Sequence, residues 1–430
     1  MSERTSARMR QFSCTLLTAE EFAAFAARAP HGNFQQTTMM GDLRAGDGTQ
    51  VDYIGVRERG RLVAAALLCT VKSAVSAFSA VYDGPLCDLD DRELTVYLMD
   101  ALAAFARKQR GAVHLDVTPE QPYRLRDGDG EATDGDPDQA MMDNLAAARM
   151  EHQGFTRGYT AVPRWRFVKD LDGIADGTQL LKSFSKRTQW SVKRAKSMGV
   201  EVRSIGLDEL DTFARIEQDT AERRHFAYRG EEYFRRFAQA FGDDAHFLVA
   251  QIDTARGVDA MERKVAGQQA KVDTLTAKIE RHDTTKLRRQ LAEESSNLKA
   301  AHKRLDEARA LAAKGDIIPV AASMFVTVPQ ETVYLFSGSV EEYKPYYASA
   351  LIQYEAMLRY CVERGVPRYN FYGIDGVFDD PDSEGRGVLE FKQGFNGRVE
   401  ELPGEFIRVL RPGRYRLLQL AHGVVDRVRR

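Results

Sequence analysis

Cysteine is scarce in this chain, which has four cysteines among its 430 residues. Cys14, Cys69, Cys87 and Cys361 lie far apart, and no two of them form a C-x-x-C pair. This spacing suggests neither a disulfide framework nor a zinc knuckle. A reducing compartment suits such a sequence.

Long hydrophobic runs are also missing. No stretch approaches the ~20 apolar residues of a membrane-spanning helix. The N-terminal segment MSERTSARMRQFSCTLLTAEEF carries basic residues but lacks the apolar centre of a signal peptide. We therefore expect a cytoplasmic protein, which could still associate peripherally with the inner face of the membrane.

Motifs of the common hydrolases and nucleotide-binding enzymes are absent. The chain has no G-x-S-x-G elbow, no Walker A loop, no G-x-G-x-x-G after a strand and no H-E-x-x-H. Its eight histidines are scattered, and His114 lies between two apolar residues, as a core histidine would. We therefore predict neither a metal site nor a cofactor.

Residues 51–120 and 245–375 repeat one order of predicted elements: strand, turn, strand, strand, helix, strand. The first copy contains VDYIGVRERGRLVAAALLCTV and the helical pattern LTVYLMDALAAFARKQRG; the second contains AHFLVAQID and SALIQYEAMLRYCVERG. This alternation predicts an α/β (α+β) fold of two similar units. Ligands preferentially bind at the junction of two such units, so we expect the active site there.

An insert at residues 255–314 interrupts the second copy. Both of its arms carry apolar residues at alternating spacings of four and three, which is the heptad pattern of a coiled coil. The polar link RHDTTK between the arms predicts an antiparallel hairpin. Such a hairpin ordinarily serves dimerisation or packing, but its charges lean basic, so contact with RNA stays open. The oligomeric state is also open, because the heptads can be satisfied within one hairpin.

The formal net charge of −2 conceals a basic run, KSFSKRTQWSVKRAKSMGVEVR, in which Glu201 is the one acid. Clustered bases create a positive field that attracts phosphates. Phe184 and Trp190 lie among these charges, which favours a polyanion site over a merely solvated helix face. The bases assigned to this site are Lys182, Lys186, Arg187, Lys193, Arg194 and Lys196.

Two strand or helix ends bear polar residues suited to chemistry. In HLDVTP, Asp116 closes an apolar strand, where it could present its carboxylate to a cleft or cap the following turn. In LEFKQGFNG, Lys392 lies between Phe391 and Phe395. Lys392 could be a surface lysine whose aliphatic stem covers apolar surface. It could also be a cation held near an oxyanion or a phosphate.

The segments KSFSKRTQWSVKRAKSMGVEVR, YLFSGSV, YNFYGIDG and LEFKQGFNG together resemble the FemABX family of non-ribosomal peptidyltransferases, over nearly the whole chain. The resemblance implies two GNAT-like domains with an antiparallel coiled-coil hairpin inserted in the second. It also implies an aminoacyltransferase that moves an amino acid from aminoacyl-tRNA to the stem-peptide amine of a peptidoglycan precursor. That precursor is lipid II or the UDP-linked pentapeptide, and the product is the interpeptide bridge.

Two alternatives remain. An acetyl-CoA-dependent N-acetyltransferase would share the repeated unit, although neither copy shows a clear R/Q-x-x-G-x-G/A loop for a pyrophosphate. A non-catalytic RNA-binding protein would use the hairpin as an arm.

The expected boundaries follow the repeat and the insert. Residues 1–160 form the first GNAT-like domain, and residues 161–254 with 315–380 form the second, on either side of the hairpin at 255–314. Residues 381–430 form a C-terminal segment that returns to the first domain.

The resemblance also implies roles for particular residues. Asp116, Phe391 and Lys392 are implied to be catalytic. The residues implied to bind the precursor are Arg44, Arg223, Arg224, Tyr228 and Tyr343. Arg44 ends QTTMMGDLR where the family has a lysine closing Q-S-x-x-W-x-x-x-K, so the charge is kept and the geometry changes. Arg223 in TAERRHF matches the arginine of T-x-x-R-x-x-F, with the adjacent Arg224 as the alternative. The charge of the basic run and of the hairpin makes both candidate tRNA contacts.

Overall fold

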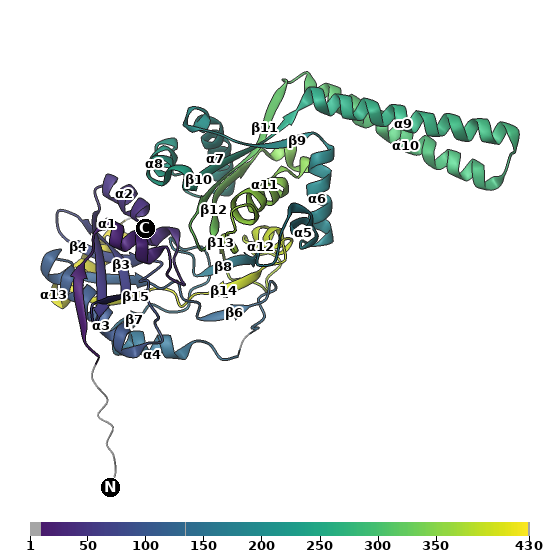
Figure 1. Cartoon of the computed structure of the whole chain (residues 1–430). Coiled ribbons are helices and arrows are strands. Elements are labelled where there is room, and N and C mark those ends of the chain that lie inside the picture. The colour runs from purple at the N-terminus through teal and green to yellow at the C-terminus, as the bar shows by residue number, and fades with distance from the viewer. Residues whose placement is uncertain (1–9, 134, 429–430) are drawn as a thin grey trace, which may run out of the picture.

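The computed structural model describes residues 10–133 and 135–428, and these form two β-sheets with helices on their faces (Figure 1). The seven-stranded sheet has the order β1-β2-β3-β4-β5-β15-β7. Its strands are β1 (Phe12–Leu16), β2 (Gln50–Glu58), β3 (Arg61–Lys72), β4 (Ala77–Tyr82), β5 (His114–Thr118), β7 (Glu151–His152) and β15 (Phe406–Val409). The strand β15, near the C-terminus, therefore completes a sheet that begins near the N-terminus.

The eight-stranded sheet has the order β6-β14-β8-β13-β12-β11-β10-β9. Its strands are β6 (Arg124–Arg126), β8 (Trp165–Asp170), β9 (Val200–Ser204), β10 (Ala245–Asp253), β11 (Ile317–Thr327), β12 (Thr332–Ser339), β13 (Arg368–Ile374) and β14 (Arg398–Glu401). Each sheet has one parallel pair, β4 with β5 and β12 with β13, and the other pairs are antiparallel.

A helix crosses over between the strands of each parallel pair, as a parallel connection requires. These helices are α3 (Arg92–Gln109) in the first unit and α11 (Ala348–Met357) in the second. The predicted repeat of strand, strand, strand, helix, strand is therefore confirmed. So is the fold class, two GNAT-like α/β units with a helical hairpin in the second.

The remaining helices are divided between the two units. Those of the first unit are α1 (Ala19–Ala26), η1 (Phe34–Gln36), α2 (Thr38–Gly46), α4 (Gln139–Ala147) and α13 (Pro412–Val428). Those of the second are α5 (Gly177–Lys182), α6 (Lys186–Ser197), η2 (Leu207–Glu209), α7 (Leu210–Arg224), α8 (Glu231–Phe241), η3 (Gly242–Asp244), η4 (Glu341–Tyr346), η5 (Leu358–Val362) and α12 (Arg386–Gln393).

Alternate residues of β10 face two different hydrophobic cores, because successive side chains of a strand point to opposite faces. Leu248 and Ala250 pack in a core with α6 and α11, whereas Phe247 and Val249 pack in a core with α7 and α8. The second core also contains Phe22 and neighbouring apolar residues of α1, α2 and β3. One hydrophobic core is thus shared by the two units and holds them together.

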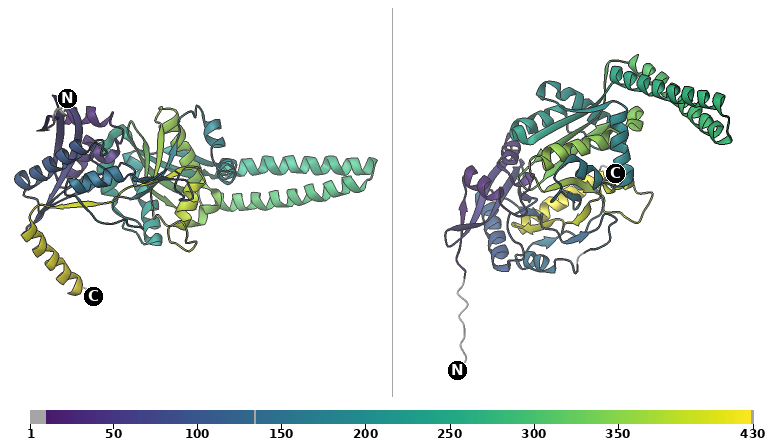
Figure 2. Two further views of the ribbon diagram at one scale, coloured as in Figure 1. Left: turned by 90° about the horizontal axis from the view of Figure 1, so that it is seen from below. Right: turned by 45° about the vertical axis from the view of Figure 1, so that its right-hand side comes forward.

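The insert forms two helices, α9 (Thr254–Arg281) and α10 (Thr285–Ala312), which project away from the body as a hairpin (Figures 1 and 2). The heptad positions Val265, Val272, Leu291 and Leu298 are half-buried, while the residues beside them are exposed. The Thr254 amide donates to the Asp316 carbonyl at 3.0 Å, so the sheet is continuous at the root of the hairpin. The supercoil of a coiled coil stays a prediction.

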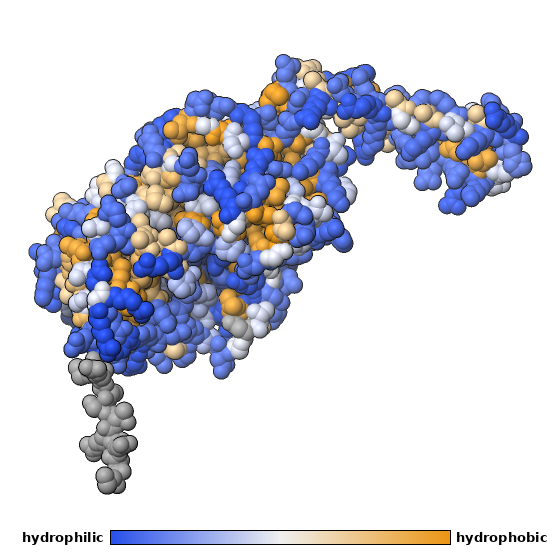
Figure 3. All heavy atoms as spheres, viewed as in Figure 1, coloured by the Kyte–Doolittle hydropathy of each residue, from blue (hydrophilic) through white to orange (hydrophobic). Residues whose placement is uncertain are grey.

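The chain crosses between the sheets more than once. β6 lies in the eight-stranded sheet although it precedes residue 160, and the segment from residue 381 contributes β14 to that sheet before β15 joins the other. The expected domain boundaries stay predictions. Within residues 10–133 and 135–428, no helix combines the length and the apolar character needed to cross a bilayer. Figure 3 shows that the hairpin surface is mostly hydrophilic.

Candidate functional site

Lys392 is buried, with 4% of its surface exposed. It lies on α12, and its ammonium group donates to the carbonyl oxygens of Gly373 at 2.6 Å and Tyr372 at 3.4 Å. Burial lowers the pKa of Lys392 to about 7. The interpretation of Lys392 as a surface lysine is therefore wrong: helix α12 is amphipathic, and Lys392 shares its buried face with Leu389.

The carbonyl groups that receive Lys392 come from an irregular part of β13. The pairing of β13 with β8 shifts register between Asn370 and Gly373, and Tyr372 has a φ of 63°. The Tyr372 amide bonds to the Asn370 side chain at 2.8 Å instead of to a neighbouring strand. A bulge of this kind turns backbone carbonyls out of the ladder, which makes them available to a side chain.

A cavity of about 310 Å³ has Phe391, the residue before Lys392, in its wall, whereas Lys392 itself does not line it. We call it the Phe391 cavity. Arg187 and Thr188 of α6, Tyr343 of η4 and Ser339 of β12 also line it. The exposed guanidinium group of Arg187 gives the rim positive charge. The structure thus brings together Phe391, Arg187 and Tyr343, which are three of the residues predicted from the sequence.

Arg223 lies next to this cavity. Its guanidinium group donates to the Ser339 carbonyl at 3.0 Å and lies 3.3 Å from the Glu341 carboxylate. Arg224 is exposed on the following position of α7. Tyr228 is half-buried, with its ring 6.2 Å from that of Phe234, and does not line the Phe391 cavity. Arg223 is therefore nearer to the cavity wall than Tyr228.

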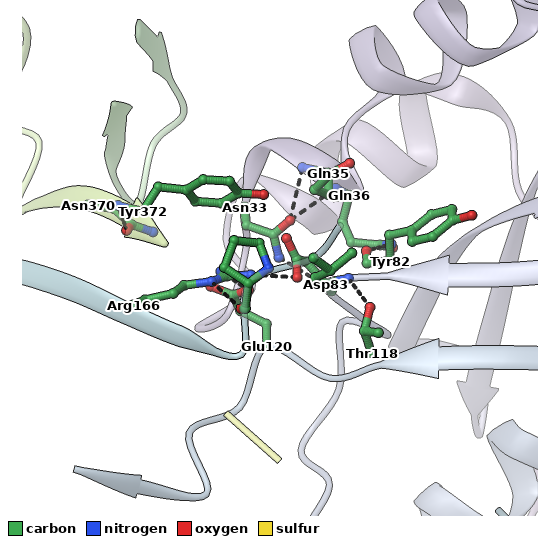
Figure 4. A network of polar contacts seen from close by, with 12 residues as sticks. Asn33, Gln35, Gln36, Tyr82, Asp83, Thr118, Glu120, Arg166, Asn370 and Tyr372 are labelled. Carbon is green, nitrogen blue, oxygen red and sulfur yellow. Dashed lines mark hydrogen bonds and ion pairs between the residues drawn. The ribbon is translucent and has the colours of Figure 1, made fainter. Parts of the chain in front are cut away.

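Buried charges join the two units (Figure 4). Arg166 of β8 is 1% exposed and forms ion pairs with Asp83, at 2.6 Å, and with Glu120. Burial raises the pKa of both carboxyl groups, although Arg166 opposes this. Asn33 donates to the Asp83 carbonyl at 2.7 Å, and the Asp83 amide donates to Thr118 at 3.1 Å. This junction network ties the end of β4 to the second sheet.

Arg44 reaches the same junction from α2. Its guanidinium group donates to Gln35 at 2.6 Å and lies 4.0 Å above the centre of the Tyr82 ring. Gln35 also lies near Tyr372, whose pKa is raised by burial. Because the Tyr372 carbonyl accepts from Lys392, the surroundings of Arg44 and of Lys392 meet at Tyr372. Two predicted residues that are 348 positions apart in the sequence are thereby linked across the junction.

Asp116 lies on β5 with its carboxylate 3.3 Å from the imidazole of His114. The other carboxylate oxygen is buried and has no hydrogen-bond partner among the described residues. His114 is stacked on Phe78, with ring centres 5.5 Å apart, and its Nδ1 atom also lacks a partner. His114 is thus not the satisfied core histidine expected from the sequence, because it and Asp116 share one half-exposed face of the strand.

The basic run begins at the last residue of α5 and forms all of α6 and most of β9. Thr188, Val192 and Ala195 of α6 face the core, and the bases lie mainly on the opposite, exposed face. Lys196 forms an ion pair with Glu355 at 3.0 Å, so its charge is partly neutralised. Phe184 is only 2% exposed and packs against Phe395, so the expectation that it accompanies the charges at the surface is wrong. The sequence around Phe184 could not reveal its burial, because Phe395, against which it packs, is distant in the sequence.

Arg166, Asp83, Glu120 and Tyr372 were not among the residues predicted from the sequence. Residues of these types are common near strand ends; burial distinguishes Arg166, Asp83 and Glu120, and a left-handed backbone conformation distinguishes Tyr372. The sole sequence signal is Arg166 in the strand-like TAVPRWRFVKDL, an unusual residue between the aromatic side chains of Trp165 and Phe167.

The FemAB family model matches residues 17–423. Aminoacyltransferase FemA of Staphylococcus aureus (strain bovine RF122 / ET3-1) is 28% identical over 420 residues, which cover 96% of this chain and 99% of that protein. The same protein of strain NCTC 8325 / PS 47 gives the same identity and coverage. The crystal structure of FemX has a TM-score of 0.77 at 23% sequence identity, over 94% of this chain and 99% of that one. This likeness to FemX shows the fold.

Proposed function

Because this chain belongs to the FemAB family, we propose that it transfers an amino acid from aminoacyl-tRNA to the stem-peptide amine of a peptidoglycan precursor. The product is the interpeptide bridge, and the acceptor is lipid II or the UDP-linked pentapeptide. The relatives named aminoacyltransferase support the reaction class. Within the molecule, the observation that carries the proposal is Lys392, a buried amine with a pKa of about 7 that directly follows Phe391, which lines a cavity with a basic rim.

The reaction is aminolysis of an ester. The amine nitrogen attacks the ester carbonyl carbon, a C–N bond forms, and the C–O bond to the terminal ribose of the tRNA breaks. The amine loses one proton, and the ribose oxygen gains one. Such a reaction needs a neutral amine, correct alignment and a stabilised oxyanion more than a protein nucleophile. This agrees with the lack of the common hydrolase motifs in the sequence.

Lys392 and Phe391 act on the aminoacyl end in this proposal. A lysine with a pKa near neutrality exchanges a proton readily at working pH. Its ammonium form stabilises the developing oxyanion or protonates the leaving ribose oxygen, and Phe391 packs against the aminoacyl end of the tRNA. Asp116, held by His114, orients or deprotonates the attacking amine.

Arg44 and Arg223 hold the phosphates of the precursor, with Arg224, Tyr228 and Tyr343 as further contacts. A guanidinium group suits phosphate because it can donate two parallel hydrogen bonds. The position of Arg44 at the junction and of Arg223 at the cavity wall supports these roles. The exposed bases of α6 and of the hairpin contact the tRNA, and binding should weaken steeply with salt.

The site of action in this proposal is the cytoplasm. A lipid-linked acceptor would bring the enzyme to the inner face of the membrane, whereas the UDP-linked pentapeptide would not require this.

The test is transfer of radiolabelled amino acids from a charged tRNA pool to lipid II and, separately, to the UDP-linked pentapeptide. Label in either acceptor supports the proposal and identifies both substrates. No label, together with consumption of acetyl-CoA, would make the protein an N-acetyltransferase. A tight tRNA complex without transfer to any amine would make it an RNA-binding protein. Wild-type transfer rates in both Lys392→Met and Asp116→Asn would refute the catalytic roles of Lys392 and Asp116.

A further inference from the structure

A second cavity, of about 560 Å³, lies where the hairpin leaves the body. We call it the root cavity. Its walls come from α6, from the first turns of α9, from the last turns of α10 and from η4. Both the labels in Figure 1 and the lining residues place α6 at the base of the hairpin. This volume falls in the range of pockets that bind small ligands.

The walls of the root cavity are fixed to one another. The Thr254 hydroxyl donates to the Gly315 carbonyl at 2.9 Å, which closes the two ends of the hairpin. Gly199, after α6, lies against Gly257 of α9 so closely that an added Cβ would be 3.4 Å from the Gly257 Cα. Arg256 of α9 forms an ion pair with Glu201 of β9. The cavity is therefore held by contacts on both sides of the root.

One wall of the root cavity is aromatic and open. Trp190 lines it with 53% of its surface exposed, and its ring centre is 5.1 Å from that of Tyr347 at an angle of 79°. Because Tyr347 touches Trp190 edge to face, the indole is supported while much of it stays exposed. An exposed tryptophan face stacks well on a nucleobase and does not distinguish strongly between bases.

The root cavity also carries positive charge. Arg194 and Arg304 both line it, and among the described residues neither forms an ion pair. Nearby Lys264 has its pKa lowered by burial and by these two arginines, which shows that the three cations share one field. Glu307 is the one acid of the lining. Cations beside an aromatic face suit the two parts of a nucleotide, its phosphate and its base.

The root cavity adjoins the Phe391 cavity, because Tyr347 lines both. A strand seated on Trp190 could therefore continue toward Phe391 and Lys392. Only an unpaired strand fits this arrangement, since the bases of a duplex are stacked on each other and unavailable to a side chain.

We propose that the root cavity binds one unpaired nucleotide close to the 3′ end of the tRNA, with its base on Trp190 and its phosphate between Arg194 and Arg304. This inference rests on the proposed function, since it supplies a subsite for the same donor. The hairpin then has a second role besides offering basic surface: α10 completes the nucleotide site by contributing Arg304.

The test uses the fluorescence of the full-length protein, which has two tryptophans, Trp190 and the 4% exposed Trp165. An RNA minihelix with a single-stranded 3′-ACCA end is titrated against the same minihelix with a blunt end. We expect the overhang to quench the fluorescence and the blunt end to leave it unchanged. Trp190→Phe should abolish most of the quenching while keeping binding.

Trp190→Ala and Arg304→Ala should each raise the Kd of the overhanging minihelix roughly tenfold. The matched control is Arg92→Ala, which removes an exposed arginine of α3 in the first unit, outside the bases assigned to the tRNA, and should change the Kd much less. Equal quenching by the blunt minihelix, or an unchanged Kd in Trp190→Ala, would overturn the subsite. So would quenching by the UDP-linked pentapeptide, because the cavity would then hold the nucleotide of the precursor.

The failure of this inference is separable from failure of the proposed function. If wild-type protein transfers label from charged tRNA and Trp190→Ala transfers it equally well at subsaturating tRNA, the root cavity has no part in tRNA binding and the function stands. If the wild-type protein transfers no label, the proposed function fails, whatever the minihelices show.

Discussion

The ammonium group of Lys392 lies 2.6 Å from the carbonyl oxygen of Gly373, and no carboxylate of the described residues pairs with it. A buried amine held only by carbonyl oxygens loses the stabilisation that an ion pair would give its charge, so its pKa falls to about 7. The bulge of β13 is what presents this oxygen. The bulge of β13 therefore helps to set the surroundings that lower the pKa of Lys392.

Replacing Lys392 with methionine should lower the transfer rate by about 10²- to 10³-fold, the range for loss of one oxyanion-stabilising donor. Lys169→Met is the matched control. Lys169 is also buried, donates to the Asn396 carbonyl at 3.2 Å and has its pKa lowered by burial to about 8, but it is not among the residues assigned to catalysis. Single-turnover transfer is the measurement. An equal loss in both variants would mean that burial of a lysine, and not its place at the site, explains the effect.

Glu217→Gln should stabilise the protein at neutral pH. Glu217 is 1% exposed, one of its carboxylate oxygens has no described partner, and burial raises its pKa to about 7. Between about pH 4.5 and 7 the folded state holds a proton that the unfolded state has lost, so wild-type stability falls as the pH rises through this window. The variant lacks this loss, so its free energy of unfolding should exceed that of the wild type by about 1–3 kcal/mol at pH 8.

Urea unfolding of both proteins at pH 5 and pH 8 measures this gain. The control is Glu222→Gln, which replaces an exposed glutamate of the same helix. The difference between its free energy of unfolding and that of the wild type should not change with pH. A gain of Glu217→Gln that is equal at both pH values would contradict the assignment.

Arg166→Met should destabilise the protein by about 3–5 kcal/mol, because it leaves Asp83 and Glu120 as unpaired buried carboxylates. The triple variant with Asp83→Asn and Glu120→Gln should regain much of this loss, since its buried groups are neutral. Arg288→Met breaks an exposed pair with Asp283 and should change the stability little. Denaturant unfolding measures all three. No recovery in the triple variant would mean that the geometry of Arg166, and not its charge, stabilises the junction.

Replacing residues 255–315 by the turn Asn-Gly should leave the body folded. Asp253 pairs with Ile317, and the Thr254 amide bonds to Asp316, so a two-residue turn can close β10 and β11. The tRNA affinity should fall, and its dependence on salt should become less steep, because phosphate contacts of the hairpin are gone. Binding titrations at several salt concentrations test this. An unchanged salt dependence would remove the hairpin from the tRNA contacts.

The helices and strands of both units follow from local patterns in the sequence. The heptads of residues 255–314 predict α9 and α10 because the spacing of apolar residues along a helix is fixed by the helix itself. The two repeats likewise predict β2 to β5 and β10 to β13 with their crossover helices. Candidate residues such as Phe391, Arg187 and Tyr343 could be named from short motifs, although their common cavity could not.

The sequence by itself determined the repeated α/β unit, the helical hairpin and the types of residue available for chemistry, because periodicity and residue type act over a few positions. Only the tertiary structure decided which residues are buried together. Lys392 looked like a surface lysine until β13 placed two carbonyl groups beside it, and Arg166 meets Asp83 from 83 positions away. Burial sets the cost of a charge, and it depends on segments distant in the sequence, so neither the pKa of Lys392 nor the junction network could be derived from local pattern.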